Sequence, residues 1–179
     1  MTDIGLERGV VRLAPYSTEW PRLFTAEREV LRRAVGELFL GVQHIGSTSV
    51  PGLMAKPIVD IAAAVANFEA AAACVAPLEA EGYVYAGENG IPRRHYFDKG
   101  TPTLFHLHVL EIESAEWRKH LLFRDYLIAH PEAATAYAAL KQELAVRFRT
   151  DRPAYTEAKG EFVMGIVRRA RGEIAAADR

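Results

Sequence analysis

The sequence has little cysteine, no long apolar run and no excess of charge of either sign, and each absence excludes a class of protein. Cys74 is the only cysteine, so no disulfide can form within the chain and a reducing, cytoplasmic setting is expected. No apolar stretch, Ile61–Phe68 included, comes near the ~20 residues that a membrane helix needs, so no membrane partner is expected. With 22 Lys and Arg against 23 Asp and Glu, the net charge of −1 gives no strong signal for nucleic-acid binding.

The order of apolar patterns predicts an α+β protein. The length of 179 residues suits one domain over residues 1–179, which would bury about 70% of its unfolded surface. We expect strands over 42–45, 57–65, 83–86, 93–98 and 103–111, with residues 10–13 as an edge strand. Helices are predicted from Ser17 or Thr18 to Leu38, from Asn67 to Glu81, and over 115–129, 131–149 and 154–176. The chain therefore reads as a mixed β-sheet with packed helices and a helical C-terminal part.

The stretch VQHIGSTSVPGLMAKPIVDI, from Val42 to Ile61, carries groups suited to binding phosphate. Gly46 and Ser47 break the first strand with a tight turn, whose backbone N–H groups and hydroxyl can meet an oxyanion. Lys56 adds a positive charge near the second strand. Asp60 lies among aliphatic residues of that strand, where a carboxylate is costly to bury unless a metal ion or another cation pairs with it.

Further polar side chains stand where they can reach this turn. His44 precedes Gly46 by two residues and is expected on the same face, lining the site. Arg93 and Arg94 begin a strand of the predicted meander, and either guanidinium could neutralise phosphate charge. His120 and His130 fall on predicted helices without partners in view, so both are interpreted as structural or surface residues.

Several segments resemble the GrpB family, a bacterial group related to the nucleotidyltransferase superfamily of the DNA polymerase β type. The matching segments are HIGSTSVPGL and AKPIVDI between His44 and Ile61, FHLHV at Phe105–Val109, and FRDYL, HPEA and YAALK between Phe123 and Lys141. The resemblance spans roughly Val11 to Arg168, and Lys159 also looks like a family position. It implies a nucleotidyltransferase-like mixed sheet, with Gly46, Ser47, Thr48 and Lys56 holding phosphate.

The same resemblance implies a defined place for acidic residues. Nucleotidyltransferases carry two acids two residues apart on the strand after the Gly-Ser turn, because residues i and i+2 share a face and can hold two divalent ions together. Asp60 matches the first acid, but position 62 is Ala62. Where the fold would carry its third acid, the chain has His106 and His108, again on one face of a strand.

Two interpretations of these residues are open. In one, Asp60, His106 and His108 converge on a divalent metal ion (Mg²⁺, Mn²⁺ or Zn²⁺), or the histidines act on a phosphate directly, with Asp60 and His108 as catalytic groups. In the other, the three are inward-facing polar residues that bond to each other. The first predicts a metal-dependent nucleotidyltransferase of unknown acceptor or a metal-dependent hydrolase; the second predicts a non-catalytic module that binds a nucleotide or another phosphorylated small molecule. Exposed helix faces leave room for a homodimer.

Overall fold

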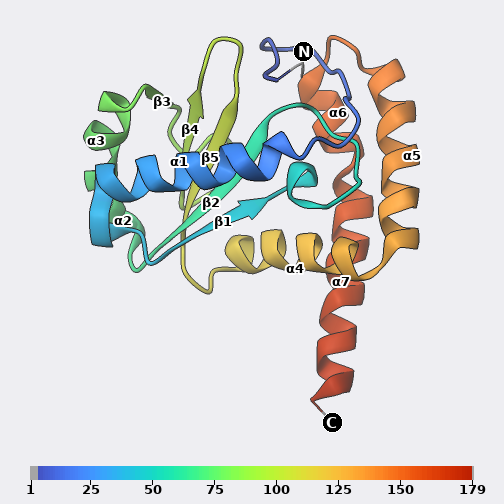
Figure 1. The fold of residues 1–179 in the computed structure, drawn as a ribbon. Helices are drawn as coiled ribbons and strands as arrows, with labels where there is room; N and C mark the ends of the chain where they lie inside the picture. Colours follow the sequence, from blue (N-terminus) through green and yellow to red (C-terminus); the bar gives the residue numbers. More distant parts are fainter. Residues whose placement is uncertain (1–3, 179) are drawn as a thin grey trace.

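The computed structural model describes residues 4–178, and over that range five strands form one mixed sheet. The strands are β1 (Gly41–Ile45), β2 (Val59–Val65), β3 (Tyr83–Tyr85), β4 (Arg94–Lys99) and β5 (Phe105–Glu111). Their order is β1-β2-β5-β4-β3 (Figure 1). The central pair, β2 and β5, is parallel, whereas the other neighbours are antiparallel. The predicted α+β fold with a mixed sheet is confirmed.

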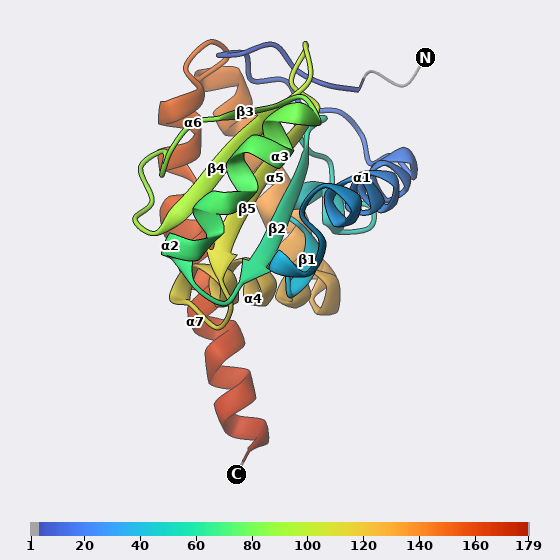
Figure 2. The ribbon, with the colours of Figure 1, turned by 90° about the vertical axis from the view of Figure 1, so that its left-hand side faces the viewer.

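Helices cover both faces of the sheet (Figures 1 and 2). One face carries α1 (Glu19–Val35), α2 (Phe68–Ala71) and α3 (Val75–Ala80). Against the other lies α4 (Ala115–Ala129), followed by α5 (Pro131–Arg147), α6 (Arg152–Ala158) and α7 (Gly160–Ala177). Single 3₁₀ turns occur at η1 (Gly36–Leu38), η2 (Ser47–Ser49) and η3 (Ala72–Cys74). No helix between residues 4 and 178 combines the length and apolar character needed to cross a membrane.

Alternation along the strands gives the two faces of the sheet different chemistry. Val59, Ile61 and Leu107 point toward α1 and α3, where they form the main apolar core. The intervening residues Asp60 and His106 point to the opposite face, because successive side chains of a strand alternate. Asp60, His106 and His108 are therefore gathered on the face turned toward α4 and the helices that follow it.

The apolar remainder of that second face packs against α4. Ala62 and Ala64 of β2 are fully buried and form a cluster with Ile45, Leu110 and Trp117. Close packing of this kind leaves no space for a larger polar group, since protein interiors are packed as densely as organic crystals. Position 62, where a nucleotidyltransferase carries its second acid, is thus part of an apolar contact between the sheet and α4.

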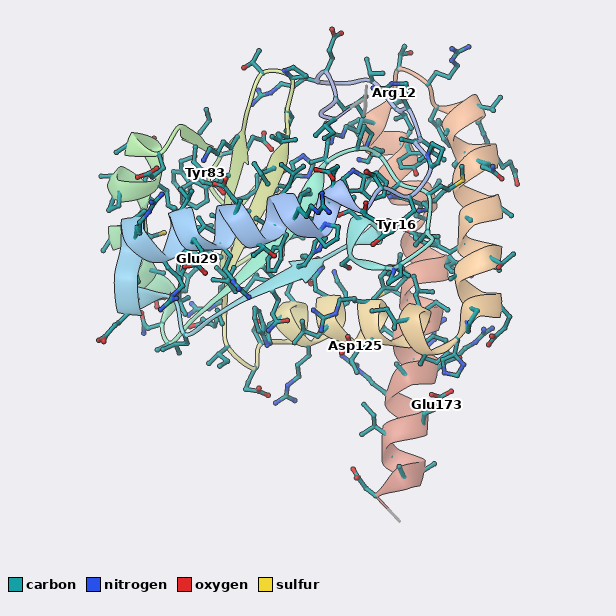
Figure 3. The ribbon with its side chains drawn as sticks, viewed as in Figure 1. Arg12, Tyr16, Glu29, Tyr83, Asp125 and Glu173 are labelled. Atoms are coloured by element: carbon teal, nitrogen blue, oxygen red, sulfur yellow. The ribbon has the colours of Figure 1, made fainter. Side chains whose placement is uncertain are left out.

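A buried ion pair joins α1 to the far edge of the sheet. The Lys99 ammonium lies 2.7 Å from the Glu27 carboxylate, and the Tyr83 hydroxyl donates a hydrogen bond of 2.9 Å to the same oxygen. Figure 3 places Tyr83 beside α1 and α3, and Glu173 on the part of α7 that projects away from the sheet. Since this cluster lies on the α1 side, it supports the sheet without reaching the polar residues of the other face.

Several predicted elements differ from the structure at their ends or in continuity. Residues 10–13 form no strand, and only Ala14 makes an isolated bridge, to Ala55. Asn67 caps its helix through Ala70 N, but the predicted helix to Glu81 is interrupted by η3, because Pro77 cannot donate to the carbonyl four residues earlier and its ring crowds that group. The helix predicted over 131–149 is α5, which ends at Arg147. The helix predicted over 154–176 is divided at Lys159 into α6 and α7.

Introducing the second acid by Ala62→Asp is expected to lower the free energy of unfolding by roughly 3–5 kcal/mol, the cost of an uncompensated buried charge. Ala62→Asn is the matched control, because it adds nearly the same volume without the charge. Urea denaturation of both variants at pH 8 would measure the difference. If Ala62→Asp were as stable as the wild type, position 62 would have room for a carboxylate and the packing argument would be wrong.

Candidate functional site

The turn that follows β1 brings its backbone against Asp60. Gly46 adopts φ 70° and ψ −171°, a conformation that is essentially restricted to glycine. A Cβ atom at this position would lie 2.6 Å from Asp60 Oδ2. The turn continues as η2, where the Ser49 hydroxyl donates to the Gly46 carbonyl at 2.5 Å. Glycine is therefore required both by the backbone conformation and by the closeness of the carboxylate.

Asp60 is bound from the neighbouring strand by two imidazoles. The parallel register places Asp60 opposite His106, whose Nδ1 donates to Asp60 Oδ1 at 2.8 Å. His108 Nε2 lies 3.9 Å from the same oxygen. Burial would raise the pKa of Asp60, but the hydrogen bonds from His106 and His108 hold it well below its usual value. Asp60 is consequently a carboxylate whose partners are already supplied by the protein.

Two arginines set the orientation of these imidazoles. Arg94 Nη1 lies 3.1 Å from His108 Nδ1, and Arg152 Nη2 lies 3.2 Å from His106 Nε2. Because a guanidinium can only donate, each of these ring nitrogens acts as an acceptor. The hydrogen of His108 is then on Nε2 and that of His106 on Nδ1, both directed at Asp60. Burial lowers the pKa of His108, which agrees with a neutral ring.

These groups line a large pocket between the sheet and the C-terminal helices. The cavity has a volume of about 1190 Å³. The turn contributes Gly46, Ser47 and Thr48 to its wall, β4 contributes Tyr96 and Asp98, and α5 contributes Tyr137 and Lys141. Asp98 Oδ1 accepts a hydrogen bond from the Tyr96 hydroxyl at 2.9 Å and lies 3.5 Å from His106 Nε2. The pocket thus contains two carboxylates flanking one imidazole.

A cluster of three lysines, Lys56, Lys141 and Lys159, lies on the wall that the C-terminal helices complete. Burial and the charges of Arg152 and Lys159 lower the pKa of Lys56 to about 7. Burial and the charges of Lys159 and Lys56 lower the pKa of Lys141 to about 7. Burial lowers the pKa of Lys159 to about 8, with Asp60 opposing the shift and Arg152 adding to it. Each shift comes mainly from burial, with neighbouring positive charge adding to it, so this wall is a poor environment for ammonium ions unless an anion joins them.

Aromatic rings hold this lysine cluster in place. The ammonium of Lys159 lies 4.3 Å from the ring centre of Tyr155, and that of Lys56 lies 5.6 Å from the same ring. Lys141 lies 4.7 Å from the ring centre of Tyr137 and donates a short hydrogen bond to the Met54 carbonyl. Cation–π contacts of this kind stabilise a positive charge without neutralising it. An anionic ligand can therefore pair with these lysines without displacing a carboxylate of the described residues.

Nine of the residues predicted for the site line this one pocket: Gly46, Ser47, Thr48, Lys56, Asp60, Arg94, His106, His108 and Lys159. They converge because β2 pairs in parallel with β5. In addition, α6 returns to the end of the sheet where β2 and β5 begin. The roles assigned to them in phosphate binding and catalysis stay predictions. Their proximity is a property of the structure.

Two residues predicted to line the site lie elsewhere. His44 faces α1, with its ring stacked on Phe24 at 4.9 Å and its Nε2 2.9 Å from the Thr48 hydroxyl, so it supports the turn from behind. Burial lowers the pKa of His44 to about 4, so its ring is neutral. Arg93 forms ion pairs with Glu69 at 2.9 Å and Glu111 at 2.8 Å, at the end of the sheet away from the pocket. His44 pairs with Ile61, whose side chain lies in the core on the α1 side, and Arg93 precedes β4 with a positive φ of 60°, so neither residue lines the pocket.

Several pocket residues were not predicted. Tyr96 and Asp98 follow Arg94 on β4 by two and four residues, so the three side chains lie on one face of the strand. Strand alternation in the sequence could therefore have predicted them. Lys141 and Arg152 come from helices distant in sequence, where no local pattern marks them. His120, interpreted from the sequence as a structural or surface residue, is one of these pocket residues. It lines the pocket beside His108, with ring centres 5.2 Å apart, and its buried Nε2 has no hydrogen-bond partner among the described residues.

The predicted metal set of Asp60, His106 and His108 is not supported by the donor atoms. Between residues 4 and 178, no group of three or more His, Cys, Asp or Glu side chains is arranged to hold a metal ion. The second nitrogen of a metal-binding histidine normally donates to a carboxylate or carbonyl, whereas here it accepts from an arginine. With Ala62 in place of the second acid, the residues present do not fit the two-ion site of a nucleotidyltransferase.

The chain matches known proteins over most of its length. The family model described as GrpB protein matches residues 10–169. A UPF0157 protein of Pseudomonas aeruginosa is 42% identical over 165 residues, which cover 89% of this chain and 67% of that protein. A UPF0157 protein of Bacillus subtilis is 39% identical over 154 residues, covering 86% of this chain and 45% of that protein. The chain thus spans 67% of the length of the first relative and 45% of the length of the second.

A third relative has a different name. A protein of Mycolicibacterium paratuberculosis named dephospho-CoA kinase is 32% identical over 193 residues, covering 92% of this chain and 47% of that protein. More than half of that relative therefore lies outside the match.

Solved structures agree with the fold described above. The crystal structure of the conserved protein GrpB from Enterococcus faecalis superposes with a TM-score of 0.85 at 34% identity, covering 91% of this chain and 99% of that one. Cid1 poly(U) polymerase bound to MgATP superposes with a TM-score of 0.54 at 15% identity, covering 74% of this chain and 44% of that one. At that identity the second likeness concerns the fold alone.

The mixed sheet, the glycine turn at its edge and these superpositions define an α+β protein of the nucleotidyltransferase-like fold class. Within that class, the chain belongs to the GrpB family.

Replacing Gly46 by alanine is expected to lower the free energy of unfolding by about 1–3 kcal/mol and to displace the Asp60 carboxylate, because the new methyl group overlaps Oδ2. Gly36→Ala is the matched control, since Gly36 also has a positive φ of 56° but nothing within 4 Å of the added atom. Urea denaturation gives the stability, and histidine ring resonances report the Asp60–His106 contact. Unchanged ring resonances in Gly46→Ala would show that the turn does not position Asp60.

Proposed function

We propose that the pocket binds a nucleotide or another phosphorylated small molecule. The observation that carries this proposal is the lysine cluster: three lysines on one wall of the pocket, none of which forms an ion pair with a carboxylate within residues 4–178. Burial of charge without a partner is costly, and it is retained in proteins mainly where a ligand supplies the partner. Phosphate groups carry several negative oxygens that can accept from more than one lysine at once.

The turn supplies further support for phosphate at this wall. Ser47 and Thr48 line the same pocket as the lysines. Burial raises the pKa of Tyr137, while a hydrogen bond with Ser47 opposes that rise. The Ser47 hydroxyl thus lies beside Tyr137 of α5, the ring on which Lys141 also packs, so the turn and the lysine cluster meet in this part of the pocket. In this arrangement Gly46 and Ser47 hold the phosphate end of the ligand, as expected from the sequence.

The supporting observations favour a binding module over a two-ion transferase. The relative named dephospho-CoA kinase extends well beyond its match to this chain, as expected if the matching part is one module of a larger protein. Ala62 packs against α4, and the imidazoles of His106 and His108 are engaged by arginines. Nucleotidyl or phosphoryl transfer stays as a second candidate because Asp60 occupies the place of the first acid in a fold shared with Cid1. A histidine-based metal-dependent hydrolase has no comparable support.

Titration of purified protein with ATP, GTP, UTP, CTP and inorganic pyrophosphate tests the proposal directly. We expect Lys141→Met to weaken binding at least tenfold, since a charge-assisted hydrogen bond contributes about 1.5–3 kcal/mol. The same substitution should raise the Tm by about 2–4 °C, because it replaces a buried ammonium with an apolar side chain of similar length. Calorimetry and thermal denaturation provide the two measurements.

Lys119→Met is the matched control for that comparison. Lys119 pairs with Glu116 on α4 and does not line the pocket, so its loss should leave affinity within twofold of the wild type. Absence of binding to every phosphate compound would contradict the proposed function. Release of pyrophosphate or phosphate during the titration, lost in Asp60→Ala, would favour the transferase.

Ligand affinity should fall as pH rises from 7 to 9. In the free protein Lys56 and Lys141 have a pKa of about 7 and Lys159 of about 8, so above these values the lysines are increasingly neutral. A bound phosphate raises each pKa, and binding then takes up protons. The loss is about tenfold per pH unit for each lysine that must be protonated. Calorimetry at pH 8 in two buffers of different ionisation enthalpy measures the uptake; proton release on binding would contradict this account.

A further inference from the structure

We propose that this pocket binds the phosphate groups of its ligand without a divalent metal ion, its lysines and arginines taking the place that metal ions hold in nucleotidyltransferases. The inference rests on the proposed function and concerns the chemical form of the ligand. It follows from three features of the described residues: the state of the carboxylate, the state of the imidazoles and the balance of charge around the cavity.

The carboxylate is the first feature. A divalent ion such as Mg²⁺ needs carboxylate oxygens that are free to coordinate and several more oxygens around them. Asp60 Oδ1 already accepts from His106 at 2.8 Å, and Oδ2 is covered by the backbone of Gly46. The side chain keeps 31% of its surface exposed and lines the cavity, with its carboxylate already in contact with the protein on both sides. Ala62 supplies no second carboxylate.

The imidazoles are the second feature. Transition metals bind the lone pair of a neutral ring nitrogen. Arg94 donates to Nδ1 of His108, and Arg152 donates to Nε2 of His106, so the lone pair of each ring is used. The remaining nitrogen of each ring carries a hydrogen and is directed at Asp60. Each histidine would have to lose its arginine before it could bind a metal.

The balance of charge is the third feature. The pocket is lined by six cationic side chains and three carboxylates, an excess of positive charge that suits a polyanion. The cations are Arg8, Lys56, Arg94, Lys141, Arg152 and Lys159, and the carboxylates are Asp60, Asp98 and Glu157. Chelation by a divalent ion neutralises part of the ligand charge that these cations would otherwise meet. The metal-free form of a nucleoside polyphosphate therefore complements the cavity better than its metal complex.

Calorimetric titration with sodium ATP and with sodium tripolyphosphate, each in EDTA and in excess Mg²⁺ at constant ionic strength, tests the inference. We expect binding in EDTA to be threefold to tenfold tighter than in Mg²⁺. Binding that is at least tenfold tighter with Mg²⁺ would overturn the metal-free proposal while leaving the phosphate pocket intact. Absence of binding in both conditions would instead overturn the proposed function on which it rests.

Titration with Zn²⁺ alone tests the part played by the arginines. The wild type should show no Zn²⁺ binding at the pocket, whereas the double variant Arg94→Met and Arg152→Met should gain at least tenfold in Zn²⁺ affinity, because both imidazole lone pairs become available. Arg118→Met is the control, since Arg118 pairs with Glu113 on the surface. Circular dichroism establishes that the double variant is folded. Equal Zn²⁺ affinity in the wild type and the double variant would show that the arginines do not exclude metal.

Discussion

The contact between Asp60 and His106 is the constraint on which the arrangement of the site depends. It spans the parallel pair β2 and β5, and the register of that pair places the two residues directly opposite each other. Once this contact is made, the remaining groups have little freedom: Gly46 must be glycine because its backbone touches the carboxylate, and Arg152 must reach the far nitrogen of the imidazole. A strand pair, a turn and a helix are thus connected through one carboxylate, which explains how short polar segments far apart in the chain form a single cavity.

The chemistry of the pocket differs from that of the fold to which it belongs. In a two-ion nucleotidyltransferase, negative protein groups hold positive ions that in turn hold the phosphates. Here the protein itself contributes the positive charge through lysines and arginines, and histidines satisfy the one carboxylate at the place of the first acid. Such a site has to keep ammonium groups partly desolvated in the absence of ligand, at a cost in stability that an apolar wall would not carry. The same desolvation strengthens any contact with an incoming anion, because fewer water molecules have to be displaced and the local dielectric is lower.

Fold and activity have to be separated in this family. The Enterococcus faecalis GrpB structure shares the whole architecture, and the Cid1 polymerase shares the sheet and its surrounding helices at low identity. A sheet of this kind supports a Gly-Ser turn and an aspartate at fixed positions, but a shared fold does not by itself define an activity. Whether a member transfers a nucleotidyl group depends on side chains at a few positions, such as Ala62, whose buried contact with Trp117 belongs to packing in this chain.

The sequence by itself determined the local elements and the part of the site that lies on strands. Strand alternation places Asp60, His106 and His108 on one face, and Gly46 marks the turn, because both signals act over a few residues. The family resemblance added the nucleotidyltransferase-like class of the sheet. Only the tertiary structure decided that Lys141 and Arg152 join the pocket, that His120 faces it while His44 faces α1, and that arginines occupy the imidazole lone pairs. These contacts depend on how the helices return to the sheet and on which face of the sheet each side chain takes. A shift of one position along a strand reverses that face, while the local sequence pattern stays unchanged.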